Sequence, residues 1–544
     1  MRGSGASNVN RHHTGIAHWL PALLLAGVLV FASDLPISRH LLGANLIQGP
    51  YASLLAASTD LGPARPQQIQ LTAALTGHQR PDDLMNWTQA RGLTVSWRPS
   101  DDWAIVEGNP DAIARAFDVT VHDYRGKQGQ QFYASPQQPQ VPEALRGEVT
   151  ELGRILGYTP HHVSRPDIAL DVPDRGLTPT ALLTTYNADK LVADGFTGKG
   201  TTIVIFAFSG YDQKDLDTFA NLFTLPRFTP ETFGDPLPVA HGETTMDLQV
   251  AHAVAPDARK VVVNARPTVQ GDGAYQKIGK LFEDVDRAYP GAIWSLSIGW
   301  GCDKLLTAAD LAPVRSALLT AQSHGTTAYN ASGDLAGLEC KGGTDWDSVP
   351  GPDDIGLDSV SSIPEMTSVG GTTLSTDDRG TWLAEQTWFD VPLSQGTGGG
   401  VSALFDLPPW QRAAAGQVPP ARNTGKRMTP DISAVADPFT GVKIVLGGDL
   451  VIGGGTSQSA PIWAGLTAIM DQYLLANGGT LIGEINPLLY RIAQGAPRPA
   501  FRDITLGGNA VDIATPGYDL VSGLGTPDVD NLARNLLIAQ RVQA

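Results

Sequence analysis

A serine that follows three glycines and precedes an apolar helical pattern is the sharpest chemical signal in the sequence. Residues 453–461 read GGGTSQSAP and lead directly into IWAGLTAIMDQYLL. A serine at the start of a helix lies close to free backbone N–H groups, which stabilise an oxyanion as it forms. Ser457 is therefore the candidate nucleophile. The alternative is a helix behind a glycine-rich turn, with Ser457 or Ser459 acting only as its cap.

A nucleophilic serine needs a base, usually a histidine that a carboxylate orients. The eleven histidines offer no HGTH-type motif. The segment 241–256 instead reads HGETTMDLQVAHAVAP, in which Glu243 and Asp247 are four residues apart. Two like charges at this spacing share one helix face and destabilise it, so they form either a functional carboxylate pair or two unrelated surface acids. His252 is expected to be a packed helix residue.

A third acid, Asp334, follows the apolar pattern TTAYN in the loop NASGDLAG. When protonated, a carboxyl group at this place donates a hydrogen bond to an oxyanion. Aspartate is also an ordinary residue of glycine-rich turns. With Ser457 and the two acids of segment 241–256, Asp334 completes a set of residues suited to acyl transfer.

The elements that must position these residues have the pattern of a parallel sheet. After Gly200, apolar strand patterns such as TIVIFAF, VVVNA and AIWSLSIG alternate with helical patterns near 215–223 and 274–289. This βαβ alternation predicts a parallel sheet covered by helices on both faces. Such sheets bind ligands beyond the carboxyl ends of their strands, which is where the loop of Asp334 is expected to lie.

An earlier region, residues 67–124, has a different pattern. Strands QIQLTAAL, TVSW, WAIVEG and TVHDY alternate with two helices in the order βαββαβ, which predicts a ferredoxin-like α+β unit. Asn109 and Pro110 are suited to begin the second helix. The region holds no cluster of titratable residues that suggests chemistry. A proline-containing stretch over 159–178 follows it and predicts an exposed, cleavable linker.

The composition of the 544 residues excludes several classes of protein. With 42% hydrophobic and 17% charged residues, the chain is not collagen-like, coiled-coil or wholly disordered. A formal net charge of −17 disfavours nucleic-acid binding. The two cysteines, Cys302 and Cys340, are too few for a disulfide scaffold or a structural zinc site. Their spacing leaves open whether they pair with each other.

The first residues are typical of an exported protein. An uncharged apolar run over 19–32 (WLPALLLAGVLVFA) follows Arg2 and Arg11, which is the order of a secretory signal peptide. The run is shorter than the ~20 residues that a membrane-spanning helix needs. We therefore expect a signal peptide over residues 1–32 and a secreted protein, with an uncleaved membrane anchor as the alternative.

These patterns together resemble the sedolisin family, the serine-carboxyl peptidases. The resemblance covers nearly everything after the signal segment and rests on GETTMD, AVAPDA, SLSIGWG, NASGD, SVGGTT, GGGVSALFDLPPWQ, MTPDISAVADP and GGTSQSAP, which occur in the family's order. It implies a subtilisin-like α/β catalytic domain over 177–540. It also implies an activation prodomain over 45–160 and a cleavable linker over 161–176.

The resemblance also implies a role for each candidate residue. Ser457 is the nucleophile, Glu243 the general base and acid, Asp247 its partner, and Asp334 the acid of the oxyanion hole. The expected activity is hydrolysis of peptide bonds at acid pH by a self-processing precursor, because unperturbed carboxyl groups titrate near ~4, where histidine is protonated. Protein or peptide substrates and the chain's own prodomain are the expected partners, without nucleic acid or a stable membrane partner.

Near the C-terminus, FRDITLGGN and TPGYDLVSGLGTP resemble the calcium loop of the same family. The resemblance implies one Ca²⁺ held by the carboxylates of Asp503 and Asp519 and by the backbone carbonyls of Ile504, Thr515 and Gly517. Oxygen-only ligands of this kind suit calcium. Thr515 stands where the family usually has glycine, and the intervening loop is shorter than in the family.

Two other functions fit parts of the sequence. A histidine-dependent, subtilisin-like protease would use His241 or His252 together with Ser457, and a near-neutral pH optimum would favour it. A catalytically silent exported binding protein could keep the same fold. In such a protein there would be no reason for all four catalytic-type side chains to be present together.

Overall fold

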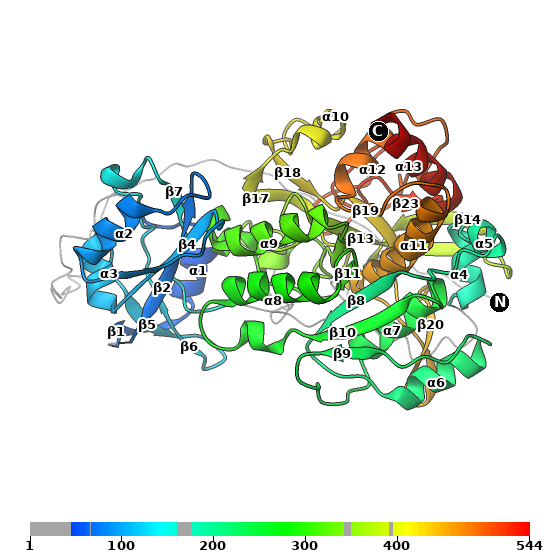
Figure 1. The fold of residues 1–544 in the computed structure, drawn as a ribbon, viewed down its shortest axis with the longest axis horizontal. Helices are drawn as coiled ribbons and strands as arrows, with labels where there is room; N and C mark the ends of the chain where they lie inside the picture. The colour runs from blue at the N-terminus through cyan, green and yellow to red at the C-terminus, as the bar shows by residue number, and fades with distance from the viewer. Residues whose placement is uncertain (1–44, 66, 160–175, 342–349, 391–394, 544) are drawn as a thin grey trace, which may run out of the picture. The chain divides into compact units, whose positions relative to one another are not determined.

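The structure is a computed structural model, and it describes residues 45–65, 67–159, 176–341, 350–390 and 395–543 (Figure 1). The predicted signal segment, and the predicted linker except for residue 176, lie outside these ranges. All the described elements belong to one compact unit of the chain, Asn45–Ala544.

The N-terminal part of this unit contains a four-stranded antiparallel sheet with two helices, in strand order β3-β4-β2-β7. Its elements are β2 (Ile69–Leu75), α2 (Asp82–Gln89), β3 (Thr94–Ser96), β4 (Trp103–Gly108), α3 (Pro110–Phe117) and β7 (Val149–Leu152). Helix α3 begins as the sequence predicts, because the Asn109 side chain accepts a hydrogen bond from the Ala112 N–H at 2.8 Å. The ferredoxin-like βαββαβ order is confirmed.

One strand of this sheet differs from the sequence expectation. The segment TVHDY contributes β5 (His122–Arg125), which pairs with β1 (Thr59–Pro63) and β6 (Gln131–Ala134) in a separate three-stranded sheet. The fourth strand is β7, because its side chains Val149 and Leu152 join the hydrophobic core of the four-stranded sheet. Tyr124 of β5 packs in a different cluster.

A larger region after residue 176 is built on an eight-stranded sheet of order β14-β13-β12-β11-β8-β10-β9, with β19 paired to β13 (Figure 1). Its strands are β8 (Thr202–Ala207), β9 (Glu231–Phe233), β10 (Arg259–Asn264), β11 (Ile293–Leu296), β12 (Thr327–Ala331), β13 (Thr367–Thr376), β14 (Trp382–Thr387) and β19 (Ile432–Val435). Every pairing is parallel except that of β13 with β14.

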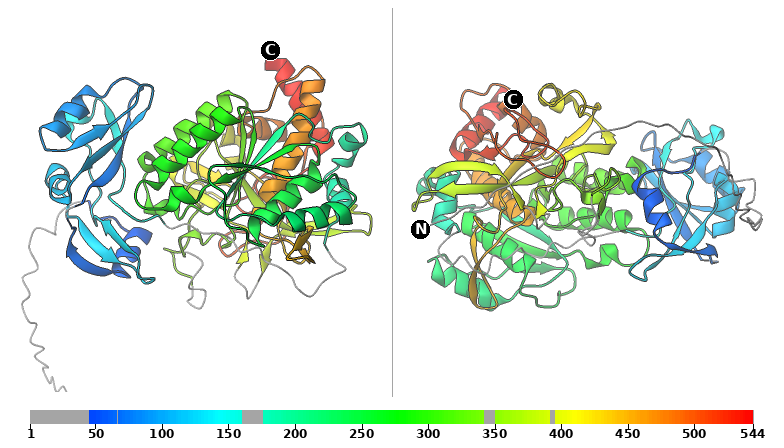
Figure 2. Two further views of the ribbon diagram at one scale, coloured as in Figure 1. Left: turned by 60° about the horizontal axis from the view of Figure 1, so that its bottom comes forward. Right: turned by 180° about the vertical axis from the view of Figure 1, so that it is seen from behind.

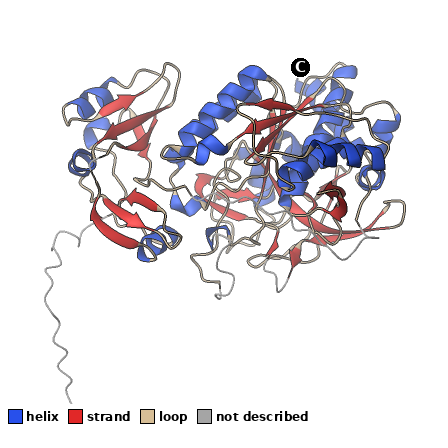
Figure 3. Ribbon diagram, turned by 90° about the horizontal axis from the view of Figure 1, so that it is seen from below, coloured by secondary structure: helices blue, strands red, loops and turns tan. Residues whose placement is uncertain are grey.

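Helices cover both faces of this sheet, as the sequence predicts (Figures 2 and 3). On one side, Ile203 and Ile205 of β8 share a core with α4 (Pro179–Thr185), α6 (Gln213–Leu222), α7 (Glu243–Val254), α11 (Thr456–Ala476) and α13 (Val529–Gln543). On the other side, Val204 and Phe206 share a core with α8 (Ala274–Ala288) and α9 (Ala312–Ser323). Burial on both faces explains the continuous apolar runs of the strands.

Loops at the carboxyl ends of two neighbouring strands are joined covalently. Cys302 follows β11 and Cys340 follows β12, and the two form a disulfide with their Cα atoms 4.7 Å apart. The pairing that the spacing left open is thus present. Smaller elements complete the described chain: α1 (Pro50–Ala56), α5 (Asp189–Ala193), β15 (Phe389–Asp390), β16 (Gln395–Gly396), β17 (Gly400–Asp406), α10 (Arg412–Ala415), β18 (Lys426–Thr429), β20 (Lys443–Leu446), β21 (Asp449–Ile452), α12 (Asn486–Ala493), β22 (Phe501–Arg502) and β23 (Thr526–Pro527).

Candidate active site

Glu243 and Ser457 lie in the first turns of two helices that pack on the same face of the sheet. Helix α7 begins at Glu243, and Ser457 is the second residue of α11. All twelve residues of α7 are buried, which explains why its sequence lacks an amphipathic pattern. The two helices approach closely at Gly465, where a Cβ atom would come within 2.7 Å of the Val254 side chain.

The turn before α11 is shaped by glycine. Gly455 has a φ of 83°, a left-handed conformation that favours glycine. Ser457 is buried, and its Oγ has no hydrogen-bond partner among the described residues. The hydroxyl of Ser459 donates to the Ala434 carbonyl oxygen at 3.0 Å. Neither serine therefore caps the helix, and the alternative interpretation of this motif is wrong.

Glu243 and Asp247 are both buried. Burial raises the pKa of Glu243 well above its usual value, the negative charge of Asp247 raises it further, and the Ser457 hydroxyl lowers it. Burial likewise raises the pKa of Asp247. Glu243 Oε1 and Asp247 Oδ1, like Ser457 Oγ, form no hydrogen bond with the described residues. Hydrogen bonds of catalytic groups often become short and well aligned only when substrate binds.

Asp334 is hydrogen-bonded to Thr456, the first residue of α11. Its Oδ1 accepts hydrogen bonds from the backbone N–H and from the hydroxyl of Thr456, each at 2.7 Å. A Cβ atom on Gly455 would lie 2.9 Å from Asp334 Oδ2, so this glycine permits the close approach of the carboxyl group. The structure thus brings Asp334 beside Ser457, and the charge of Asp334 acts on Glu243.

Two further polar residues lie at the site, although the sequence patterns do not single them out. The Ser297 hydroxyl donates to the Ser457 carbonyl oxygen at 3.0 Å. Glu339 Oε1 accepts a hydrogen bond from the Leu335 N–H, next to Asp334, and burial raises the pKa of Glu339 well above its usual value. Ser297 had a signal, because it directly follows a buried strand at the ligand-binding edge of the sheet. No sequence signal pointed to Glu339, since its loop lacks periodicity.

The two candidate histidines are engaged elsewhere. His252 lies nine residues beyond Glu243, about 13 Å along the helix, and its Nε2 is 2.7 Å from the Pro226 carbonyl oxygen. Burial, followed by the charge of Lys260, lowers the pKa of His252 to about 3. His241 Nδ1 lies 3.0 Å from Asp215 Oδ2. No histidine in the described part of the chain forms a hydrogen bond with the Ser457 hydroxyl.

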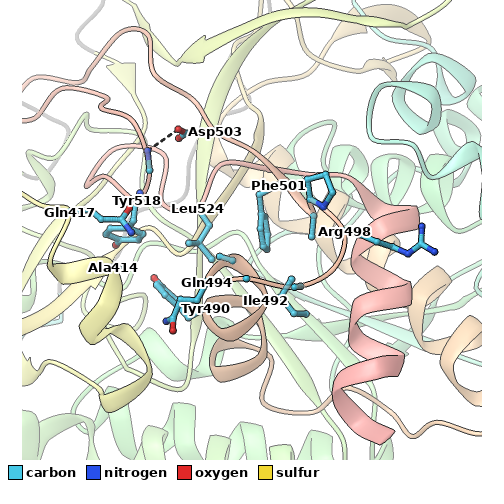
Figure 4. A pocket seen from close by; sticks show the side chains of 16 residues that line it. Ala414, Gln417, Tyr490, Ile492, Gln494, Arg498, Phe501, Asp503, Tyr518 and Leu524 are labelled. Carbon is cyan, nitrogen blue, oxygen red and sulfur yellow. Dashed lines mark hydrogen bonds between the residues drawn. The ribbon is translucent and has the colours of Figure 1, made fainter. Parts of the chain in front are cut away.

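Both acids of the predicted calcium loop contact the backbone of the turn at residues 515–517. Asp503 Oδ2 accepts a hydrogen bond from the Gly517 N–H at 2.8 Å (Figure 4), and Asp519 Oδ2 accepts one from the Thr515 N–H at 3.0 Å. Burial raises the pKa of Asp519 to about 6, a cost that a bound divalent cation would offset. The predicted ligands, two carboxylates and backbone carbonyls, are all oxygen donors, and their chemistry fits calcium.

A cavity of about 340 Å³ lies beside this turn, lined in part by Asp503, Gly517 and Tyr518 (Figure 4). The loop also supports the active site. The Ala510 N–H donates to the Ala336 carbonyl oxygen at 3.1 Å, two residues beyond Asp334. This loop therefore contacts the loop that carries the candidate oxyanion acid.

Comparison with known proteins identifies the family. Residues 67–152 match the family model described as Pro-kumamolisin, activation domain. The chain is 30% identical over 488 residues to kumamolisin of Bacillus sp. (strain MN-32), and the alignment covers 84% of this chain and 82% of the relative. The chain belongs to the sedolisin family. It is also 28% identical over 471 residues to sedolisin of Pseudomonas sp. (strain 101), covering 78% of this chain and 73% of the relative.

A solved structure of the same family has a similar fold. Pseudomonas sedolisin, described as a serine-carboxyl proteinase complexed with two molecules of pseudo-iodotyrostatin, aligns with a TM-score of 0.55 and 25% identity, covering 66% of this chain and 97% of that one. This sedolisin-family chain is therefore a serine-type peptidase, with a subtilisin-like catalytic domain. Its activation domain acts as an intramolecular inhibitor, so the chain is a zymogen.

Proposed function

We propose that this chain is an exported peptidase that acts at acid pH and cleaves peptide bonds through Ser457, Glu243 and Asp247. The observation that carries the proposal is the burial of the two carboxyl groups beside the Ser457 hydroxyl, at a place where no described histidine reaches. A buried carboxyl pair whose pKa values are raised is suited to accept and return a proton. A catalytically silent binding protein would not need this arrangement.

The proposed reaction is acyl transfer through a covalent intermediate. The ionised Glu243 accepts the proton of the Ser457 hydroxyl as Oγ attacks the carbonyl carbon of the scissile peptide bond. The protonated carboxyl group of Asp334 donates a hydrogen bond to the oxyanion. Glu243 then gives its proton to the leaving amine as the C–N bond breaks, which leaves an acyl-enzyme on Ser457. Water hydrolyses this ester, with Glu243 again accepting and returning the proton.

The acid pH range follows from the protonation states that these steps require. Glu243 and Asp247 titrate as a coupled pair, because ionising one raises the pKa of the other. At the lowest pH both are protonated and no base is present. As the pH rises, the pair first loses one proton, which supplies the base. The oxyanion also needs a proton donor, and only a protonated carboxyl group of Asp334 can supply one.

We also propose that the chain is made as a precursor in which residues 45–160 contact the catalytic domain at 177–540. The Arg154 N–H donates to the Asp310 carboxylate at 3.1 Å, and the Arg98 guanidinium pairs with Glu283 at 2.6 Å. Cleavage in the linker over 161–176 would release this inhibitor. The proposal that the chain is exported rests on the apolar run over residues 19–32. No helix in the described ranges is both long and apolar enough to span a bilayer.

Incubation of the precursor at pH 4 is expected to lower its mass to that of a chain beginning within 161–176, as activity appears. The Ser457→Ala precursor should keep its full mass under the same conditions, because it lacks the nucleophile. Mass spectrometry and an activity assay on the same time points check this. A protein that becomes active while keeping its full precursor mass would contradict release of the inhibitor.

One Ca²⁺ in the loop of Asp503 and Asp519 is proposed as the metal of this enzyme. Binding at 100-fold excess over its Kd would stabilise the fold by about 2.7 kcal/mol, so chelation with EGTA is expected to lower the Tm of the mature enzyme. Asp503→Asn should lower the Tm and remove its response to calcium. Thermal melting with and without calcium measures both effects.

The matched control is Asp378→Asn, which changes an exposed aspartate in the turn between β13 and β14. This variant should keep the Tm of the wild type and its full response to calcium. If chelation leaves the Tm of the wild type and of Asp378→Asn unchanged, the loop does not hold calcium. If Asp503→Asn still responds like the wild type, the ion is bound at another site.

A further inference from the structure

We propose that Ser297 is a positioning residue of this active site, which holds the backbone of the nucleophile Ser457 in place and acts on the neighbouring carboxyl group of Asp247. The inference rests on the proposed function, because it assigns to Ser297 a role in the serine-carboxyl reaction. Ser297 does not touch the reacting atoms. It acts through the two residues that it contacts.

The sheet places Ser297 on the side of the two catalytic helices. Ile293 of β11 packs in the core shared with α7 and α11, whereas Trp294 and Leu296 pack in the core on the opposite face. Since successive side chains of a strand alternate between faces, Ser295 and Ser297 point toward α7 and α11. Both are buried. Ser297 directly follows the last residue of β11, at the edge of the sheet where Ser457 lies.

A proline in α11 explains why the Ser457 carbonyl needs a partner from outside the helix. In an α-helix this carbonyl would accept a hydrogen bond from the N–H four residues later, at position 461. That residue is Pro461, which has no N–H. The Ser297 hydroxyl supplies the missing donor at 3.0 Å, in a buried environment. An unpaired buried carbonyl would be costly, so Ser297 fixes the backbone of the nucleophile to the sheet.

The same hydroxyl also faces the second acid of the pair. A side-chain hydrogen bond from Ser297 lowers the pKa of Asp247, against the effect of burial. A hydroxyl carries one proton, so it donates either to the Ser457 carbonyl or to an ionised Asp247. When Asp247 is protonated, the hydroxyl is free to donate to Ser457.

The other charged groups near α7 interact with partners other than Asp247. The charge of Asp334 acts on Glu243 of the pair. Before the helix, His241 is paired with Asp215 of α6. At its far end, the buried Lys260 lies 3.1 Å from His252 Nδ1.

Ser297→Ala tests the inference in the acid-activated enzyme. We expect kcat to fall on the order of tenfold with KM nearly unchanged. Loss of the hydrogen bond that lowers the pKa of Asp247 should raise the pKa of the pair, so the acidic limb of the kcat/KM profile moves to higher pH. The matched control is Ser295→Ala, since Ser295 is buried on β11 two residues before Ser297 and its Oγ has no partner among the described residues. The control should keep the kcat and the pH profile of the wild type.

A second substitution separates the two contacts of Ser297. Pro461→Ala returns an N–H that can pair with the Ser457 carbonyl. Adding it to Ser297→Ala should recover most of the lost kcat, while the acidic limb stays shifted because the contact with Asp247 is still absent. If Ser297→Ala alone does not fold, the double variant is compared directly with Pro461→Ala, and the shifted limb is still expected.

The outcomes distinguish this inference from the proposed function. If wild type and Ser295→Ala are active at acid pH and Ser297→Ala matches them in kcat and pH profile, Ser297 has no positioning role. A fall in kcat without a shifted limb, or without recovery by Pro461→Ala, also overturns the inference. Wild-type protein that has no acid activity, or that keeps activity after Ser457→Ala, instead contradicts the proposed function itself.

Discussion

Glu243→Gln is expected to abolish peptide hydrolysis while the protein stays folded, with kcat reduced by about three orders of magnitude. The amide of glutamine has nearly the shape of the carboxyl group but cannot accept the proton of the Ser457 hydroxyl. Steady-state hydrolysis of a peptide substrate at the pH optimum of the wild type measures the loss. We do not expect Asp247 to replace Glu243 as the base, because Asp247 lies one helical turn further along α7.

The same variant should also change the stability of the protein. Measuring this change distinguishes loss of catalysis from loss of the fold. The pKa of Glu243 is higher in the folded protein than in the unfolded chain, because burial and Asp247 oppose ionisation. The folded state therefore holds more protons, and the free energy of unfolding falls as the pH rises from the unfolded pKa to the folded one. Glutamine does not titrate, so Glu243→Gln removes this fall in the free energy of unfolding. Its Tm should equal that of the wild type at pH 3 and exceed it at pH 7.

Glu231→Gln is the control for both measurements. Glu231 is a half-exposed surface residue that pairs with Arg259, so its substitution should leave the activity and the pH dependence of Tm close to those of the wild type. Full activity in Glu243→Gln would show that another group serves as the base.

Asp334→Ala is expected to lower kcat by about 10²–10³-fold with little change in KM. The carboxyl group interacts with an oxygen that becomes negatively charged only in the transition state, so substrate binding should be largely unaffected. Hydrolysis of a peptide substrate over a range of concentrations separates the two parameters.

Asp334→Asn gives a sharper test of the same role. The asparagine carbonyl oxygen can still accept the hydrogen bonds of Thr456, and its N–H₂ group can donate to the oxyanion at any pH. We therefore expect partial activity that declines less steeply on the alkaline side than in the wild type. If Asn and Ala variants are equally inactive and share the wild-type pH dependence, Asp334 does not act through a proton that it donates.

The candidate site could be predicted from the sequence because each part of it is a local pattern. The glycine-rich turn before Ser457 and the four-residue spacing of Glu243 and Asp247 can be recognised without knowledge of the fold. The parallel sheet then brings the first turns of α7 and α11 together. The roles of these residues stay predictions, although the structure places their side chains at one site.

The features that the sequence did not predict depend on contacts between distant segments. The fourth strand of the ferredoxin-like sheet is β7 rather than the segment TVHDY, because the core selects Val149 and Leu152. The disulfide of Cys302 and Cys340 requires that two strand ends be neighbours. The place of Ser297 after a buried strand is visible in the sequence, but its contact with the carbonyl that Pro461 leaves unpaired is not.

The most direct test of the account is hydrolysis of a denatured protein substrate at pH 4 and pH 7 by the acid-incubated precursor, with Ser457→Ala treated in parallel. We expect hydrolysis at pH 4, little at pH 7, and none by Ser457→Ala at either pH. Activity mainly at pH 7, or activity that survives Ser457→Ala, would contradict it.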